Sequence, residues 1–229
     1  MQNNNVNQIY RNRFSKKDLI SKNGIWKVLC KFFRKLIISN LHKEDFSILD
    51  LGAGYCEFIN NISTSGKRTA VDFNPDIFHF VSKDVNAVCS SVLDITCTIS
   101  EKYDAVFVSN LFEHFNSSEE LLKCMNEIHS ILSPHGLLIV LQPNIDLCGS
   151  RYWDFIDHKL PVNIPRMKEA SELCNFKTLK IIPRFLPYTT QSRLPKWGWL
   201  IQCYLWLLPF SGWLFGKQSL FVFTPENKS

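Results

Sequence analysis

The sequence predicts an α/β fold, a doubly wound and mostly parallel sheet with helices on both faces. Three observations predict it. Short apolar runs typical of buried strands alternate with segments of helical period along most of the 229 residues. A glycine-rich turn, Gly52-Ala53-Gly54, directly follows the first such run. The next run ends on a carboxylate, Asp72, which lies 22 residues after Asp50 at the start of the turn.

Composition limits the class of protein before any motif is considered. The apolar fraction of 45% and the charged fraction of 21% are those of a globular protein and not of a disordered one. The eight cysteines form no C-x-x-C pair, which argues against a zinc knuckle or a redox motif. A polar start, MQNNNVNQ, indicates no signal peptide. We therefore expect a cytoplasmic protein with reduced thiols.

Residues 1–43 are predicted to form a basic, amphipathic helical extension. From Phe14 to Ile38 apolar residues recur at helical spacing between lysines. Ten Lys/Arg residues and a single acid, Asp18, fall in this region, which suggests an anionic partner. Two interpretations stay open: a helix packed on the domain, or one that lies on a membrane surface or covers the cofactor.

Residues 44–229 are predicted to form one domain. Seven strands are expected in it, over 46–51, 68–72, 87–90, 104–109, 137–141, 178–185 and 219–224. Helices are expected over 55–62, 75–81, 119–132 and 165–174. Strands separated by helices at this spacing indicate a parallel sheet with helices on both faces.

An apolar insertion, residues 188–217, precedes the last strand. Within it Trp197–Phe215 carries no charge over nineteen residues, about the length of a membrane span. Pro209 interrupts a helix there, and flanking strands that share one sheet lie on the same side of any membrane, which excludes a single crossing. Its four tryptophans favour an interfacial position. The alternatives are a lid over the site and a buried helical pair that completes the core.

The turn after the first strand, Asp50-Leu51-Gly52-Ala53-Gly54, is the strongest functional motif. Its glycines let the backbone approach a ligand closely. A dinucleotide-binding loop would place a third glycine at position 57, where this chain has Glu57, so a bound pyrophosphate is disfavoured. The acid Asp50 suits instead the cationic amino group of an amino-acid moiety.

In these residues the chain resembles the class I methyltransferases that depend on S-adenosylmethionine (SAM). Their first motif is an acid followed by G-x-G-x-G, and ILDLGAGYCE departs from it only at Cys56. The stretches YDAVFVSNLFEHF and LSPHGLLIV resemble the fourth-strand motif and the hairpin before the fifth strand, with His135 in place of a glycine. The resemblance covers residues 46–142 and implies SAM as the cofactor, with a seven-stranded sheet whose last strand is antiparallel.

The same resemblance implies a set of cofactor-binding residues. The loop after the first strand would hold the methionine part, and Asp72 would hold the ribose hydroxyls. Adenine would lie near Val92, after the third strand. The whole expected set is Asp50, Gly52, Ala53, Gly54, Asp72, Phe73, Val92 and Asn110.

Two histidines are the predicted catalytic residues. His114 follows the fourth predicted strand and His158 lies in the loop after the fifth, so both belong to the edge where open α/β sheets bind ligands. Either could act as a general base on an acceptor hydroxyl. Glu113, His114 and a later histidine resemble the divalent-metal ligands of some members of the class. Because Asn110 stands where those members have a further acid, we expect no metal.

The acceptor is indicated by a second resemblance. The motifs R-Y-W-D-F-x-D-H, R-F-L-P-Y-T-T-x-S-R-L-P and G-K-Q-S-L resemble those of bacterial class I members associated with surface polysaccharide and lipid-linked sugar pathways. This implies O-methylation of a glycan or lipid-linked acceptor, with peripheral binding to the inner face of the plasma membrane.

Two rival functions stay open. One is methylation of a diffusible aromatic or quinone-like molecule, and the other is a non-catalytic scaffold with this fold. A nucleic-acid substrate is not expected, because S-N-L-F replaces the N-P-P-Y-type motif of base-amine transfer.

Overall fold

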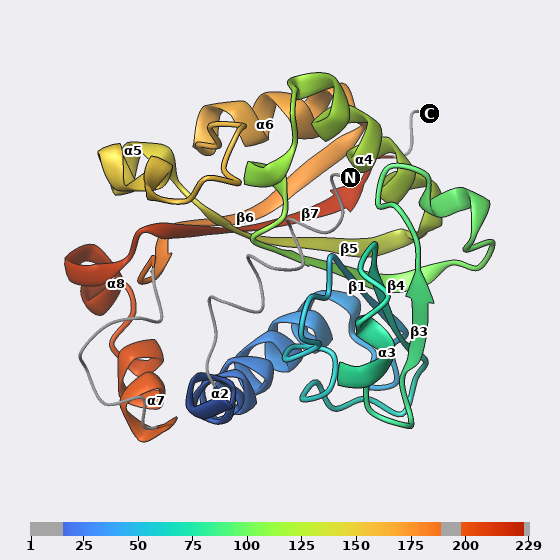
Figure 1. The fold of residues 1–229 in the computed structure, drawn as a ribbon, viewed down its shortest axis with the longest axis horizontal. Coiled ribbons are helices and arrows are strands. Elements are labelled where there is room, and N and C mark those ends of the chain that lie inside the picture. Colours follow the sequence, from blue (N-terminus) through green and yellow to red (C-terminus); the bar gives the residue numbers. More distant parts are fainter. Residues whose placement is uncertain (1–15, 189–197, 227–229) are drawn as a thin grey trace.

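The computed structural model describes residues 16–188 and 198–226, with the side chains of residues 16–22 left out. Its centre is a seven-stranded sheet of order β3-β2-β1-β4-β5-β7-β6 (Figure 1). The strands are β1 Ile48–Leu51, β2 Arg68–Asp72, β3 Asn86–Cys89, β4 Tyr103–Ser109, β5 Leu132–Pro143, β6 Phe176–Leu186 and β7 Gln218–Pro225.

The strand directions confirm the predicted fold class. Strands β1 to β5 pair in parallel, and β7 pairs antiparallel with both β5 and β6. Neighbours β2 and β4 flank β1 on opposite sides, so the chain leaves β1 and β4 in opposite directions across the sheet. The carboxyl ends of β1 and β4 therefore meet at the topological switch point, where such sheets bind ligands.

Helices cover both faces of this sheet (Figure 1). Helices α4 and α6 lie on one face, and α2 packs on the other, with α7 against α2. The helices are α2 Lys16–Leu41, α3 Ile77–Phe80, α4 Ser118–Ile131, α5 Ile145–Cys148, α6 Ile164–Leu173, α7 Gly198–Trp206 and α8 Phe210–Phe215, with 3-10 turns η1 Ile95–Cys97, η2 Phe112–His114 and η3 Gly149–Asp154.

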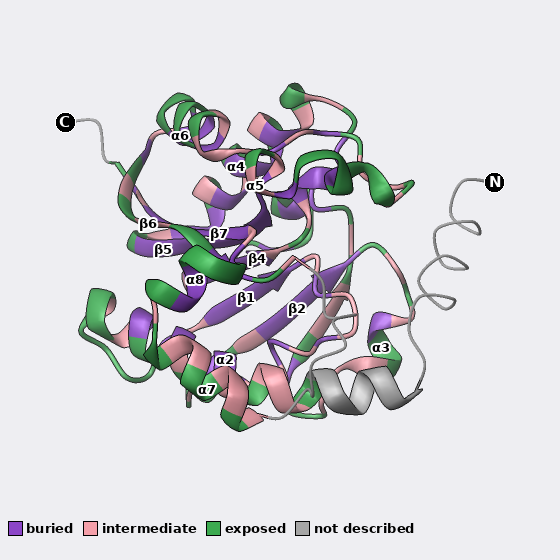
Figure 2. Ribbon diagram, turned by 90° about the vertical axis from the view of Figure 1, so that its left-hand side faces the viewer, coloured by how far each residue is buried: buried purple, intermediate pink, exposed green. Residues whose placement is uncertain are grey.

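Strand β4 shows how the alternation of side chains builds two cores. Ala105 and Phe107 point into the layer beneath α2, whereas Val106 and Val108 point into the layer beneath α4 and α6. Strand β1 is buried at every position, and β4 at all but Asp104 and Ser109, which are half-buried (Figure 2). A strand covered on both faces reads as a continuous apolar run, which is why DAVFVS is so clear in the sequence.

The N-terminal helix is part of this core. Leu29, Phe33, Leu36 and Ile37 of α2 are buried against the sheet, while its lysines at positions 27, 31 and 35 are exposed. Helix α2 falls where the sequence predicts a basic amphipathic helix, and its apolar stripe packs on the sheet. Among the described helices, none combines the length and the apolar character that a membrane crossing needs.

The helix predicted over 55–62 is wrong, because the chain after Gly54 forms a series of turns. Asn60 N does donate to Cys56 O at 3.0 Å, as in a helix. Its side chain, however, reaches another segment, where Nδ2 donates to Phe80 O at 2.8 Å. Asparagine favours such local polar bonds over a helix interior. The loop itself, and not a helix terminus, thus supplies the backbone amides beside the cofactor motif.

Candidate active site

The cofactor loop starts where β1 ends. The amides of Gly52 and Ala53 both donate to Val71 O of β2, at 2.8 and 2.9 Å. Gly52 and Gly54 have φ values of 75° and 52°, a left-handed conformation that glycine adopts without strain. A Cβ at Gly54 would meet nothing within 4 Å, so the loop leaves open space beside its backbone. Such a cradle suits a ligand that approaches the main chain.

Asp72, at the end of β2, is tied to this loop. Its Oδ2 accepts from Gly54 N at 2.8 Å, and its Oδ1 accepts from Asn74 N at 2.9 Å. Burial raises the pKa of Asp72, and these backbone amides act in the opposite direction. Each carboxylate oxygen has a further lone pair, so the group can still accept from ribose hydroxyls.

Asp50 lies deeper, on β1. The side chain is 3% exposed, and burial raises the pKa of Asp50 well above its usual range, with the nearby Glu57 and Asp72 carboxylates adding to the shift. A buried carboxylate is costly unless a cation compensates it. The amino group of an amino-acid ligand would supply that cation.

Cys56 stands where the motif of the class has its third glycine. Its φ is 59°, so this residue holds the glycine-like conformation with a side chain present. The thiol is fully buried, and burial raises its pKa, since the carboxylates nearby also disfavour a thiolate. Cys56 therefore replaces the glycine of the motif but keeps the backbone conformation of a glycine. Because burial raises the pKa of its thiol, the cysteine is a poor nucleophile.

The other predicted cofactor residues surround this loop in different ways. Phe73 is 47% exposed, directly after Asp72, and Val92 is buried in the core beneath α4. Asn110 has a φ of 50°, and its N donates to Leu141 O at 2.9 Å, which turns the chain sharply out of β4. A Cβ on Gly52 would approach the Leu111 side chain to 3.0 Å, so the loop after β4 touches the cofactor loop.

The two histidines predicted separately lie side by side. The ring centroids of His114 and His158 are 5.2 Å apart. Nδ1 of His114 is 3.0 Å from the carbonyl oxygen of Asp157. A carbonyl oxygen only accepts, so Nδ1 carries the proton and Nε2 of neutral His114 presents a lone pair. His114 therefore has the tautomer that a general base requires.

His158 is the more enclosed of the two. Its side chain is 6% exposed, against 23% for His114, and the rings of Tyr152, Phe155 and Tyr188 surround it. Burial lowers the pKa of His158, although the Glu113 carboxylate acts in the opposite direction. His158 is thus neutral at neutral pH, and its position is that of a supporting group behind His114.

Glu113 is the functional residue that the sequence reasoning undervalued. Its side chain is 1% exposed, Oε2 accepts from Gln142 Nε2 at 2.5 Å, and Oε1 lies 3.9 Å from His158 Nε2. The backbone oxygen of Glu113 also accepts from Lys159 N at 2.7 Å, which holds the His158 loop against β4. The polar Gln142, directly after the apolar run of residues 137–141, was the signal that could have exposed this network.

These side chains also form the residue set that could hold a metal. Glu113, His114 and His158 each offer one ligand atom, and the three atoms lie within 4.8 Å of one another. Two imidazoles and one carboxylate suit transition metals better than Mg²⁺. The expectation of no metal therefore stays a prediction, and chelation tests it.

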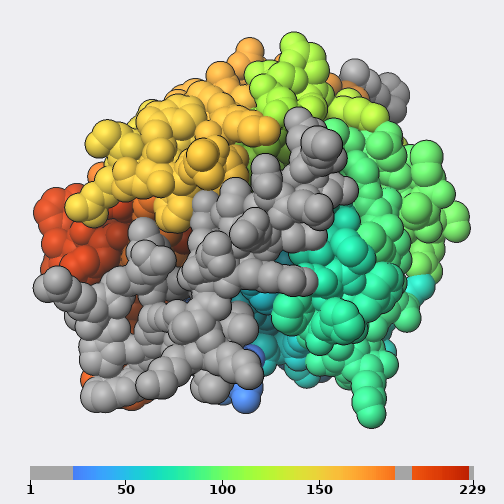
Figure 3. Space-filling view, viewed as in Figure 1, coloured from blue at the N-terminus to red at the C-terminus, as the bar shows by residue number. Residues whose placement is uncertain are grey.

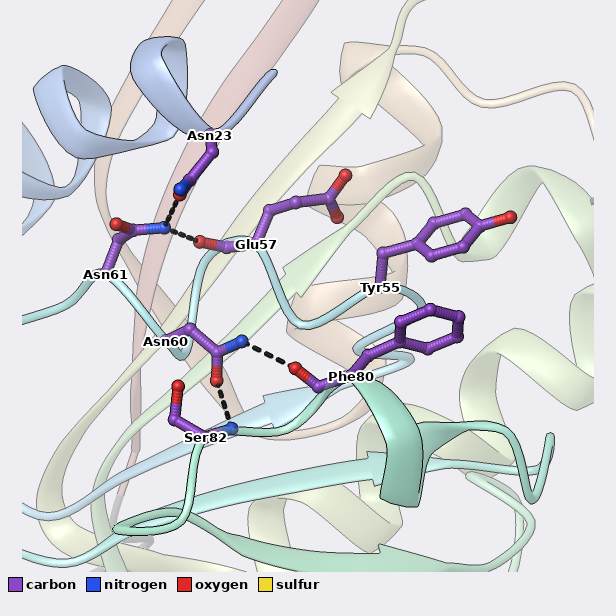
Figure 4. Close-up of a pocket in the computed structure, with 7 residues that line it drawn as sticks. All are labelled: Asn23, Tyr55, Glu57, Asn60, Asn61, Phe80 and Ser82. Carbon is purple, nitrogen blue, oxygen red and sulfur yellow. Dashed lines mark hydrogen bonds between the residues drawn. The ribbon is translucent and has the colours of Figure 1, made fainter. Parts of the chain in front are cut away.

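A separate pocket of about 420 Å³ lies beside the turns after Gly54 (Figure 4). Asn61 Nδ2 donates there to Asn23 Oδ1 at 2.7 Å, which ties the pocket to α2. The lining residues are Asn23, Tyr55, Glu57, Asn60, Asn61, Phe80 and Ser82. None of the predicted site residues lines it, so we place neither the cofactor nor the acceptor there.

Together, the sheet order, the cradle after β1 and the carboxylate at the end of β2 define the class I SAM-dependent methyltransferase fold. Residues 49–140 match the family described as the methyltransferase domain. No curated protein matches the chain. Residues 49–140 thus match a methyltransferase domain, and the fold implies SAM as the cofactor, as the sequence predicts.

Solved structures share this fold at low sequence identity. The chain is similar to the plantazolicin methyltransferase BamL, solved with S-adenosylhomocysteine and a triazolic analogue (TM-score 0.68, 13% identity, 99% of this chain and 92% of that one). It is also similar to SAM-dependent methyltransferases from Clostridium acetobutylicum (0.64, 11%, 88% and 92%) and Archaeoglobus fulgidus (0.56, 21%, 83% and 93%). At such identities the likeness concerns the fold.

Proposed function

We propose that this methyltransferase transfers a methyl group to a hydroxyl oxygen of a glycan or lipid-linked acceptor, at the inner face of the plasma membrane. The observation that carries the proposal is the pairing of His114 with His158 at the carboxyl end of β4, next to the cofactor loop. A hydroxyl needs a base to lose its proton, whereas sulfur or amine acceptors need less help.

SAM, when bound, supplies a methyl group that is already electrophilic on a sulfonium. The chain has then to position the acceptor and remove one proton. In our proposal the acceptor oxygen forms the new C–O bond as the C–S bond breaks, and its proton passes to Nε2 of His114. Asp157 O holds the opposite nitrogen of that ring, and Glu113 and His158 lie behind it. Such a base contributes a factor of about 10²–10⁴ in rate.

The test uses cells and purified protein together. Lipid-linked and surface glycans from cells with and without the chain are compared by intact mass, and we expect the loss of one methyl group per acceptor. Purified protein should then restore that mass with labelled SAM. Unchanged glycans, with transfer of label to no hydroxyl-bearing acceptor, would refute the proposal.

One rival has a specific observation in its favour. The rings of Phe155 and Tyr188 beside His158 would also suit a diffusible aromatic acceptor. Transfer to small phenols at rates above those for glycans, with no need for membranes, would support that rival. The scaffold reading is tested by calorimetry, because a non-catalytic protein that had lost its cofactor would show no SAM binding above background.

A further inference from the structure

Helices α7 and α8 expose large apolar side chains at a density found nowhere else in the described residues. Seven of the thirteen exposed large hydrophobic residues fall within residues 199–215. We call these seven the apolar surface: Trp199, Trp206, Leu207, Phe210, Trp213, Leu214 and Phe215. Scattered exposed hydrophobics need no explanation, but a contiguous set marks an interaction site.

The apolar surface is held in place by the domain and does not complete its core. Helix α7 packs on α2, where a Cβ on Gly198 would lie 3.4 Å from Val28. Tyr204 Oη donates to Phe185 O at 2.9 Å, and Ser211 Oγ donates to Tyr204 O at 2.6 Å. Trp206 nevertheless stays 81% exposed and Trp213 68% exposed. Both helices are thus fixed while their aromatic residues face outward.

The charges beside the apolar surface are all of one sign. The chain has no Asp or Glu from 173 to 225, and none from 19 to 43 on the helix that α7 contacts. Lys27, Lys31 and Lys35 are exposed along α2, while Arg184 and Lys217 border α8. Outward aromatic side chains with basic neighbours match the boundary of an anionic lipid bilayer. A second copy of this chain would bring like charges together.

The apolar surface also lies at the edge of the sheet where the reaction occurs. Helix α8 leads into β7, which starts at Gln218 opposite Pro143, the carboxyl end of β5. Lys217 N donates to Leu186 O at 2.7 Å, and Lys217 O accepts from Asn144 N at 3.0 Å. Figure 3 shows α8 beside the segment that follows β5 on one face of the molecule. The segment after β5, which carries His158, and the apolar surface are therefore neighbours.

We infer that α7 and α8 form an interfacial membrane-binding surface, and that the acceptor is held in the bilayer by a lipid anchor while its polar head reaches His114. The second half of this inference rests on the proposed function, but membrane binding does not require it. The helices contain nine and six residues, so they lie in the plane of the interface.

Vesicle co-sedimentation of the full chain tests the binding directly, without SAM or acceptor. We expect binding to vesicles of phosphatidylcholine with phosphatidylglycerol, weaker binding to phosphatidylcholine alone, and a loss at high salt. The double variant Trp206→Ser/Phe210→Ser should bind at least about tenfold more weakly, because two large apolar side chains no longer enter the lipid.

A control variant removes two exposed apolar side chains elsewhere. Leu173 on α6 is 63% exposed, as is Phe210, and Leu179 is 42% exposed. The variant Leu173→Ser/Leu179→Ser should sediment as the wild type does, and circular dichroism and SAM affinity should be unchanged in both double variants.

Three results would overturn the inference: a wild type that stays in solution with anionic vesicles, a Trp206/Phe210 variant that still sediments, or a dimer in ultracentrifugation that this variant dissociates. If the protein binds vesicles but methylates only diffusible acceptors, the membrane surface stands and the proposed function fails.

Discussion

The cofactor half of the site is formed mainly by the main chain of the loop after β1. The acceptor half is formed by side chains that come from separate segments. The Gly54 amide, in the loop after β1, bonds to Asp72 at the end of the adjacent strand β2. The His114 ring, by contrast, meets a loop 43 residues further along the chain, at Asp157. A backbone cradle binds one constant cofactor, while a side-chain cluster can change with its acceptor. A substitution in one half should therefore change either SAM affinity or the rate of methyl transfer, and not both.

The largest expected effect breaks the acceptor half alone. His114→Ala should lower the rate of methyl transfer about 10²–10⁴-fold and leave SAM affinity unchanged, because the imidazole takes a proton without holding the cofactor. Single-turnover rates and calorimetry measure the two quantities. His135→Ala, at an exposed position near the start of β5, is the control and should behave as the wild type. A joint loss of both properties in His114→Ala would show that the halves are coupled.

The converse change breaks the cofactor half. Asp72→Ala should weaken SAM binding about 10–10²-fold, since charge-assisted hydrogen bonds to the ribose disappear. The rate at saturating SAM should change far less. Isothermal titration with SAM and with S-adenosylhomocysteine checks this. Asp72→Asn keeps one acceptor oxygen for Gly54 N and should fall between the wild type and Asp72→Ala; equal affinity in all three proteins would remove Asp72 from the site.

Asp50→Asn should change the stability of the SAM-free protein and its SAM affinity in opposite directions. The pKa of Asp50 is raised in the folded protein, so its ionised form destabilises the fold at neutral pH. Removing the charge should raise the melting midpoint of the SAM-free protein by roughly a few degrees. SAM affinity should fall up to about tenfold, because the amino group loses its counter-charge.

The pH dependence of this variant has a definite sign. A group with a raised folded pKa binds more protons in the folded state, so wild-type stability improves as pH falls through that pKa. The advantage of Asp50→Asn should accordingly vanish in acid and grow as pH rises above the ordinary carboxyl range. Thermal melts across pH measure it, and an advantage that grows toward acid would contradict the assignment.

The smallest expected effect concerns the histidine pair itself. Dialysis against EDTA should leave the rate unchanged, since Asn110 stands where the metal-dependent members of the class have a further acid. Initial rates before and after dialysis provide the measurement, with elemental analysis of the same samples. Activity that is lost on dialysis and restored by Mn²⁺ or Zn²⁺ would make the two histidines metal ligands.

Local patterns were sufficient for most of the fold. All seven strands were predicted within a few residues. The central ones, β1 and β4, are the clearest, because a strand buried on both faces is a visible apolar run. The helix over 55–62 failed because its asparagines bond to other segments, which a local pattern does not contain. Residues 189–197, within the predicted insertion 188–217 and including Trp197, lie outside the described part of the chain.

The sequence predicted those parts of the candidate site whose residues lie close together along the chain. Asp50, Gly52, Gly54 and Asp72 follow from a motif and a spacing, so their mutual placement could be anticipated. That His114 and His158 adjoin each other depends on the loop held by Glu113 O, a long-range contact. The Gln142–Glu113 bond has the same origin, and only the folded chain makes it visible.

The position of β7 has a consequence for how the protein is made. Among the described strands, β6 pairs only with β7, which follows it in sequence although it lies between β5 and β6 in the sheet. On the ribosome β6 must therefore remain unpaired, together with the apolar helices α7 and α8, until β7 emerges. Until then two strand edges and the tryptophan-rich helices are open to wrong partners. A chain that ends before Gln218 should aggregate during synthesis, even though every residue of the cofactor loop is already present.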